Sequence, residues 1–289
     1  MHEGYFPVPG AQLYFREIGN GRPLLILHGG PDFNHNYLVP DLDRLSSTFR
    51  LIYYDQRGRG KSSPGVAPET VTVESEVDDV DRLRQFFGLE TIALLGHSWG
   101  CLIAMEYATC HPDQVSHLIL LNTAPASHAD LLRFRGQRQA AEAPGLAKKR
   151  TISDTPEYAA GDIEMDAEYY RAHFSKALRR PDQLETVVRR LRSHFKPEDI
   201  VKAREIEDRL YAQTWLSRDY DLLVRLRNLN LPTLIVHGDH DFVPLECARS
   251  IAEAMSRSRL VVLSDCGHFA YLERPAAVLD TIVDFLPQY

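Results

Sequence analysis

The fold is decided by one short stretch, residues 92–104, which reads IALLGHSWGCLIA. Its first four residues are apolar and predict a buried strand, and the apolar run after position 100 predicts a helix. Between them GHSWG (residues 96–100) must turn sharply, because a side chain at either glycine would collide with neighbouring backbone. This strand–turn–helix context is that of a nucleophile elbow, which exposes a serine hydroxyl at the end of a sheet. We therefore predict Ser98 as a catalytic nucleophile.

A serine hydroxyl needs a base to take its proton, and the candidate base is His268. It closes DCGH (residues 265–268), which follows the last apolar strand run, residues 260–263. Loops at the carboxyl ends of the strands meet at one edge of such a sheet, so we expect His268 near Ser98. A structural histidine that caps the next helix is the alternative, and the position after the last strand argues against it.

Two carboxylates compete to orient this base, because GDHD (residues 238–241) follows the strand run 234–236. The acid of such a triad fixes the tautomer of the histidine and stabilises its charged form. We choose Asp241, since Asp239 lies closer to the strand and would more naturally cap the turn. His240 is interpreted as loop structure. The resulting order, Ser…Asp…His, is the one used by the α/β-hydrolase fold.

A glycine loop, HGGPD (residues 28–32), follows the apolar run 24–27. Acyl transfer passes through a tetrahedral oxyanion, which needs N–H donors that are already in place. We predict that the backbone N–H of Gly30 is one donor and that the backbone N–H of Trp99, directly after the nucleophile, is the other.

Outside these motifs, short apolar runs alternate with amphipathic helical stretches, as in βαβ units around a parallel sheet. Between positions 123 and 231 the alternation stops and only helical spacing is found. We predict an α/β core domain made of residues 1–122 and 232–289, with residues 123–231 inserted as a helical cap. An independent middle domain is the weaker alternative, because Leu231 and Pro232 lead straight into a core strand.

The composition of the 289-residue chain is that of an ordinary globular protein, with 44% apolar and 25% charged residues. A net charge of −7 gives no reason to expect nucleic acid as a partner. The four cysteines lack paired or metal-like spacing, and neither a Walker loop nor a dinucleotide fingerprint is present, so we expect no cofactor and no metal. The N-terminus lacks the features of a signal peptide and no apolar stretch is long enough to span a bilayer. We therefore expect a cytoplasmic protein without a membrane partner, and the oligomeric state stays open.

Taken together, the motifs resemble those of the proline iminopeptidase group. That group is recognised by His-Gly-Gly-Pro, by Asp-Gln-Arg-Gly-x-Gly-x-Ser and by a Ser-Trp-Gly elbow, which here are residues 28–31, 55–62 and 98–100. The resemblance implies an α/β-hydrolase fold, with a mostly parallel eight-stranded sheet, helices on both faces and an inserted helical cap. It also implies a peptidase whose cap glutamates hold the free amine of the substrate. Residues 55–62 are expected to buttress the site.

The chain departs from this group at three points. Asp32 stands where the group usually has glycine, the Gly-His start and Cys101 of the elbow are shared with general esterases, and the cap lacks the Trp-Glu pairing of the peptidases. The acidic residues of the predicted cap include Glu142, Glu157, Asp162, Glu164, Asp166, Glu168, Glu205 and Glu207.

Three functions therefore stay open. An aminopeptidase acting on a short peptide, slightly favoured by the resemblance, needs an anionic cap site. A carboxylesterase or lactonase needs an apolar pocket. A ligand sensor with slow turnover would keep the same fold and triad, because fold alone does not fix function. In each case we expect the small-molecule or short-peptide ligand to contact Gly29, Phe33, Trp215 and Phe269.

Overall fold

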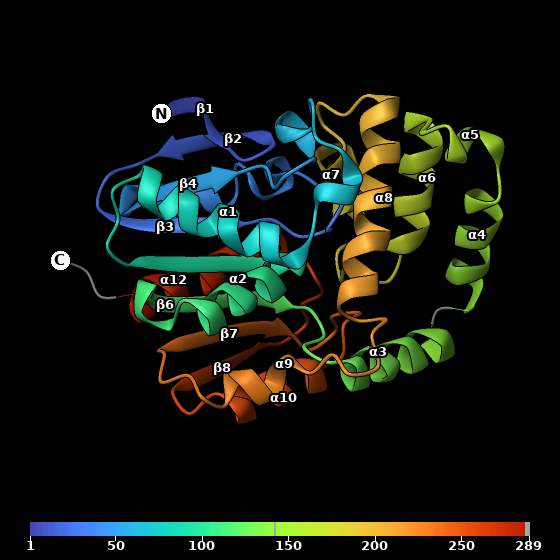
Figure 1. Ribbon diagram of the computed structural model, residues 1–289. Helices are drawn as coiled ribbons and strands as arrows, with labels where there is room; N and C mark the ends of the chain where they lie inside the picture. Colours follow the sequence, from blue (N-terminus) through green and yellow to red (C-terminus); the bar gives the residue numbers. More distant parts are fainter. Residues whose placement is uncertain (142, 287–289) are drawn as a thin grey trace.

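The structure, a computed structural model, describes residues 1–141 and 143–286 (Figure 1). Its centre is an eight-stranded sheet with the strand order β1-β2-β4-β3-β5-β6-β7-β8. The pairs β1–β2 and β2–β4 are antiparallel, and all later pairs are parallel, which confirms the predicted α/β-hydrolase sheet. The strands are β1 (His2–Val8), β2 (Ala11–Ile18), β3 (Arg22–Leu27), β4 (Phe49–Tyr54), β5 (Ile92–Ser98), β6 (Val115–Thr123), β7 (Thr233–Gly238) and β8 (Ser258–Leu263).

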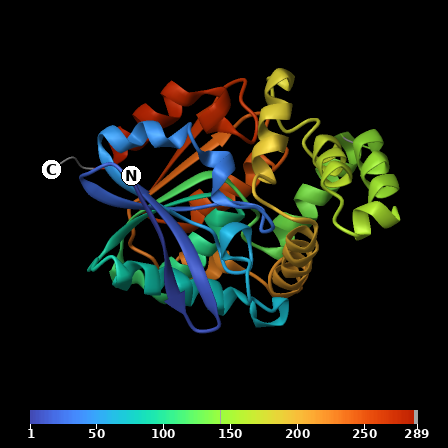
Figure 2. The same ribbon diagram turned by 90° about the horizontal axis from the view of Figure 1, so that it is seen from above.

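Helices cover both faces of this sheet (Figure 2), so the middle of each central strand is a continuous apolar run. Alternate side chains of a strand point to opposite faces. In β3, Leu25 and Leu27 belong to one apolar cluster with α1 and α2, whereas Leu24 and Ile26 belong to a second cluster with α12. The helices of the core are α1 (Val73–Phe86), α2 (Trp99–Cys110), α10 (Leu245–Ala254), α11 (Ala270–Glu273) and α12 (Pro275–Phe285).

The segment between β6 and β7 is helical, and we call residues 124–232 the helical insertion. Its helices are α3 (His128–Ala141), α4 (Ala143–Ser153), α5 (Pro156–Ala159), α6 (Ile163–His173), α7 (Leu184–Leu191), α8 (Pro197–Gln213) and α9 (Leu222–Leu226). Helices α3 to α8 gather on one side of the sheet (Figures 1 and 2). Glu142 lies outside the described residues. No helix in the described ranges combines the length and the apolar character that crossing a membrane requires.

The helical insertion is closed at its base by a single pair of residues. Ser127 and Asp221 form an isolated antiparallel bridge. Two backbone hydrogen bonds, of 2.9 and 3.0 Å, flank this pair. Residues 128–220 therefore leave and rejoin the core at one point, and α9, which follows, packs against α2 and α10.

Candidate active site

Ser98 lies at the sharp junction between β5 and α2. Its backbone adopts φ 54° and ψ −119°, in the left-handed half of conformational space that non-glycine residues rarely occupy. A Cβ at Gly96 would approach the backbone N of Cys101 to 2.5 Å, and one at Gly100 would approach the backbone O of Leu27 to 2.2 Å. Both glycines are therefore required for a turn this tight, as expected for a nucleophile elbow.

His268 and Asp241 meet at the carboxyl edge of the sheet. The Nδ1 of His268 lies 2.8 Å from Oδ1 and 3.0 Å from Oδ2 of Asp241. The carboxylate also accepts hydrogen bonds of 2.9 Å from the backbone N–H of Val243 and from Nδ2 of Asn122. Burial alone would raise the pKa of Asp241, but the His268 and His237 imidazoles, together with these hydrogen bonds, hold the pKa below its ordinary value. Asp241 is therefore a fixed anion beside the imidazole.

The competing carboxylate, Asp239, has different partners. Its Oδ1 accepts a hydrogen bond of 3.2 Å from the backbone N–H of Cys266 and lies 2.7 Å from Nδ1 of the exposed His240. Asp239 thus ties the loop after β7 to the loop after β8. Of the two carboxylates, the structure brings Asp241 to His268.

A cavity of about 80 Å³ opens beside these residues, and Ser98, His268 and Gly30 all line it. The predicted contact residues Phe33, Trp215 and Phe269 line it too. Six more lining residues carry phenylalanine or tyrosine rings: Phe134, Tyr169, Tyr170, Phe174, Tyr211 and Phe242.

Two residues predicted to take part in the site lie behind this lining. The side chain of Trp99 is fully buried, with its ring centroid 5.2 Å from that of Trp215. Gly29 is in contact with protein on its inner side, where an added Cβ would lie 3.0 Å from the Cβ of Ser98. Neither Trp99 nor Gly29 therefore lines the cavity. Both pack beneath the residues that do.

A chain of buried hydrogen bonds joins the glycine loop, the elbow and the histidine loop. The Gly29 N–H donates to the Tyr37 hydroxyl over 2.7 Å, and that oxygen lies 2.7 Å from Nδ1 of His97. The Nε2 of His97 is 3.0 Å from the backbone O of His268, so it carries the proton and Nδ1 accepts one from Tyr37. Burial, and the neighbouring His268, lower the pKa of His97 to about 3, so this link is neutral. The three loops are thereby fixed relative to one another.

The segment 55–62 supports the glycine loop from below. The side chain of Gln56 donates to the backbone O of His28 over 2.7 Å, and its backbone N–H donates to Nε2 of His28 over 3.1 Å. Arg59 in turn donates to Oε1 of Gln56 over 2.6 Å and pairs with the buried Glu76. This segment therefore fixes the start of the glycine loop, and none of its residues lines the cavity.

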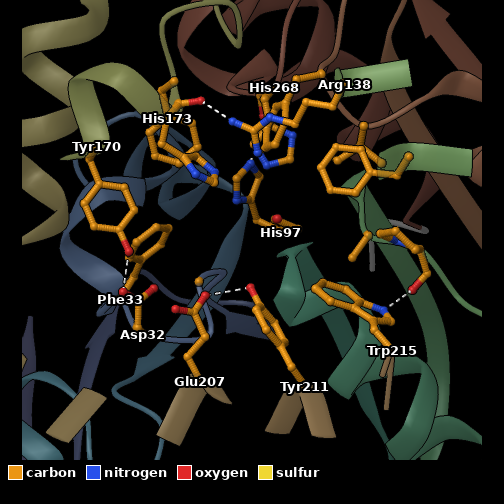
Figure 3. A pocket seen from close by; sticks show the side chains of 18 of the residues that line it. Asp32, Phe33, His97, Arg138, Tyr170, His173, Glu207, Tyr211, Trp215 and His268 are labelled. Carbon is orange, nitrogen blue, oxygen red and sulfur yellow. Dashed lines mark hydrogen bonds between the residues drawn. The ribbon is translucent and has the colours of Figure 1, made fainter. Parts of the chain in front are cut away.

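One wall of the cavity is acidic, and we call Asp32 and Glu207 the acidic wall. Figure 3 shows their side chains next to one another on the cavity surface. Asp32 is buried, and its Oδ1 has no hydrogen-bond partner among the described residues. Glu207 accepts a hydrogen bond of 2.6 Å from the Tyr211 hydroxyl. A buried carboxylate oxygen without a donor is costly, so this wall is suited to a ligand that donates hydrogen bonds.

Asp32 is also the core end of an ion network that reaches into the helical insertion. Its Oδ2 accepts hydrogen bonds from Arg192 at 2.5 Å and from the Tyr170 hydroxyl. The Nε of Arg192 lies 2.5 Å from Asp166, which also pairs with Arg204. Asp32, Arg192 and Asp166 are all buried. This network joins α6, the end of α7 and α8 to the glycine loop.

We expect Arg192→Met to lower the free energy of unfolding by about 3 kcal/mol or more, because it leaves the buried carboxylate of Asp32 without its cation. Urea unfolding followed by circular dichroism measures this change. Arg190→Met is the matched control two residues away, because the half-buried pair of Arg190 with Asp41 should contribute no more than about 1 kcal/mol. Equal losses in both variants would contradict the expectation, and adding Asp32→Asn to Arg192→Met should restore part of the loss.

Several residues of the site were not predicted from the sequence. Asn122 donates a hydrogen bond that orients Asp241. The only sequence feature that pointed to Asn122 was that it is a polar residue at the carboxyl end of a strand. Asp32 stood out as a departure from a family pattern, without an indicated role. Glu207 was one of seventeen acidic residues in the predicted cap, and no periodicity separated it from the others. In the part of the chain that the structure describes, no group of His, Cys, Asp and Glu side chains could hold a metal ion.

Comparison with known proteins gives a consistent assignment. The family described as the α/β hydrolase fold matches residues 22–275. A proline iminopeptidase from Lactobacillus delbrueckii subsp. lactis is 30% identical over 305 residues, which cover 98% of this chain and 97% of that protein. A proline iminopeptidase structure from Mycobacterium smegmatis has a TM-score of 0.72 at 22% identity, covering 98% of this chain and 97% of that one. An esterase structure from Exiguobacterium antarcticum has a TM-score of 0.71 at 25% identity, covering 96% of each chain. The chain therefore belongs to the α/β-hydrolase fold family, as a hydrolase that resembles the proline iminopeptidases.

Proposed function

We propose that the protein is a serine aminopeptidase that removes the N-terminal residue of a short peptide through an acyl-enzyme. Ser98 attacks the carbonyl carbon while His268 takes the hydroxyl proton, and Asp241 stabilises the resulting imidazolium. The backbone N–H groups of Gly30 and Trp99 donate to the oxyanion. His268 then gives the proton to the leaving amine, which departs. Water, activated by the same imidazole, hydrolyses the ester and restores the Ser98 hydroxyl.

The acidic wall is the observation that supports an amine-bearing substrate. A free N-terminal ammonium is a charged donor with three N–H groups, or two in proline, and Asp32 Oδ1 is a buried acceptor without a donor. Glu207 adds a second carboxylate on the same side of the cavity. An ester or lactone without a donor group would leave Asp32 Oδ1 unsatisfied. We propose that the helical insertion acts as the cap that supplies this half of the site, since Glu207 lies on α8.

The proposal is tested by assaying the purified protein in parallel against prolyl and alanyl arylamides and against p-nitrophenyl esters. Arylamide cleavage that is lost when the substrate amine is acetylated supports the aminopeptidase. Ester turnover without arylamide cleavage would instead make the protein a carboxylesterase or lactonase, for which the aromatic lining of the cavity is suited. Ligand binding with negligible turnover of either class would make it a sensor. Ser98→Ala is the control for each activity.

The protonation of Glu207 should make amine binding depend on pH. Burial and the nearby Asp32 raise the pKa of Glu207 to about 8, against the lowering effect of Tyr211, Lys149 and Arg192. Below that pH the empty site holds a neutral carboxylic acid, which must lose its proton to bind an ammonium well. We expect kcat/KM for an arylamide, divided by that for an ester, to rise about tenfold or more between about pH 6 and pH 8.

Glu207→Gln should remove this rise, because glutamine does not titrate. It should also lower kcat/KM for arylamides by about 10- to 100-fold, the contribution of a hydrogen bond to a charged group. Ester hydrolysis serves as the internal reference, since it shares His268 and lacks the amine. Glu205→Gln, on the exposed side of the same helix, is the matched control. If both variants keep the wild-type pH dependence of the arylamide-to-ester ratio, the assignment of Glu207 to the amine site is wrong.

A further inference from the structure

The helical insertion also supplies hydrogen-bond donors, which gather around His173 beside the cavity. Arg138 comes from α3, Lys149 from α4 and His173 from α6. Figure 3 shows Arg138 and His173 on one side of the cavity and Glu207 on the opposite side. Arg138 donates to the backbone O of His173 over 2.7 Å, and Nζ of Lys149 lies 2.7 Å from Nδ1 of His173. The three side chains thus form one cluster, which we call the donor cluster.

The tautomer of His173 leaves an N–H donor at Nε2, in addition to the donors of Arg138 and Lys149. A lysine ammonium can only donate, so Nδ1 of His173 accepts and the ring proton lies on Nε2. Burial, with the neighbouring Lys149 and Arg138 charges, holds the pKa of His173 well below its ordinary value, so the ring stays neutral. Its Nε2 makes no hydrogen bond within the described ranges, and the ring lines the cavity. An N–H in that position is suited to an acceptor on a ligand.

The donor cluster lies on the side of the catalytic base. The ring of Phe242 has its centroid 4.5 Å from that of His268 and 5.7 Å from that of His173. The guanidinium of Arg138 lies 5.0 Å from the centroid of the same Phe242 ring. One aromatic ring therefore separates the donor cluster from the imidazole that would protonate a leaving amine. In a peptide, the atoms beyond that amine would extend toward these donors.

A second cavity, of about 440 Å³, adjoins the donor cluster on the outside, and Arg138, Lys149 and His173 line it as well. Arg135 and Arg150 add two more guanidinium groups to its wall. Among its described lining residues there is no carboxylate. Cationic side chains thus continue from the donor cluster along the wall of the second cavity. They would attract an anionic group more strongly than a neutral one.

We propose that Arg138, Lys149 and His173 form a subsite for the C-terminal carboxylate of the substrate, so that the preferred substrates are unblocked dipeptides and tripeptides. The inference rests on the proposed aminopeptidase function, to which it adds a second site that binds a charged end of the peptide. The acidic wall would take the ammonium and the donor cluster the carboxylate, with the scissile bond between them at Ser98. Because each residue adds about 3.5 Å to an extended chain, two fixed anchors limit the length of the peptide.

The test compares an unblocked dipeptide, such as prolylalanine, with the same dipeptide as its C-terminal carboxamide. For the wild-type protein we expect kcat/KM to be about tenfold or more higher for the acid, the contribution of a charge-assisted hydrogen bond. Lys149→Gln and Arg138→Gln should each lower this acid-to-amide ratio several-fold. Lys148→Gln is the matched control, because Lys148 is exposed, pairs with Glu168 and points away from the cavity lining.

The outcomes separate the subsite from the function on which it rests. Equal cleavage of acid and amide, together with rapid arylamide cleavage, would overturn the carboxylate subsite and leave the aminopeptidase intact. A ratio that falls equally in Lys148→Gln would also overturn it. If no peptide or arylamide is cleaved, the proposed function fails, and calorimetric titration of Ser98→Ala with both dipeptides decides the subsite. Tighter binding of the acid, lost when Lys149→Gln is added, supports the subsite, and equal binding contradicts it.

Discussion

Ser98→Ala is expected to lower kcat for the preferred substrate by about 10⁶-fold, the loss seen when a serine nucleophile is removed from an intact triad. The reason is chemical, because alanine keeps the Cβ and has no oxygen to form the acyl-enzyme. Alanine occupies the φ of 54° as readily as serine does, so the free energy of unfolding should stay within about 1 kcal/mol. Steady-state kinetics and urea unfolding of the same preparation measure both effects.

Labelling with a fluorophosphonate gives an independent measurement of the nucleophile. The wild-type protein should gain one phosphonate on the peptide that contains Ser98, and mass spectrometry should find that peptide unmodified in the variant. Activity that survives Ser98→Ala, or a label on another serine, would show that the elbow is structural and that the nucleophile lies elsewhere.

Asp241→Asn should lower kcat by about 10⁴-fold, because an amide cannot satisfy all the donors that surround this carboxylate. Oδ1 faces N–H donors from Val243 and His268, and Oδ2 faces the amide of Asn122. An asparagine must place its own NH₂ group against one of these sides. If it faces His268, the imidazole moves its proton to Nε2 and can no longer accept the proton of Ser98.

Asp239→Asn is the matched control for this loss, two residues away in the same loop. Asp239 accepts from the backbone of Cys266 and lies beside His240, so its substitution should change kcat by less than about tenfold. A larger loss in Asp239→Asn than in Asp241→Asn would reverse the assignment of the acid.

The sheet and the residues around Ser98 could be predicted because each requirement is local. The run 92–95 is apolar because helices cover β5 on both faces, and the glycines at 96 and 100 are fixed by contacts with backbone close by. Parallel strands then bring the loops that carry His268 and Asp241 to the same edge. Sequence order and strand pattern therefore sufficed to choose these three residues.

The acidic wall and the donor cluster could not be predicted, because they depend on how helices pack over the sheet. Asp32 comes from the core and Glu207 from α8, and the register between them is set by packing rather than by any motif. Helices of the insertion such as α3 and α4 are weakly amphipathic, so their sequences do not indicate which side faces the cavity. That Arg138 lines the cavity and that Lys149 contacts His173 follow only once α3, α4 and α6 are placed.

The bridge between Ser127 and Asp221 has a consequence for how this protein could diversify. Residues 128–220 begin and end next to one backbone pair, so a different segment could be joined at the same two positions in a single genetic exchange. Such an exchange would retain Ser98, Asp241 and His268 and would discard Glu207, Arg138, Lys149 and His173 together. Core carboxylates that pair with this segment, among them Asp32 with Arg192 and Asp41 with Arg190, would need new partners. Under the proposed function, the reacting residues and most of the charged substrate contacts would thus lie in different segments of the gene.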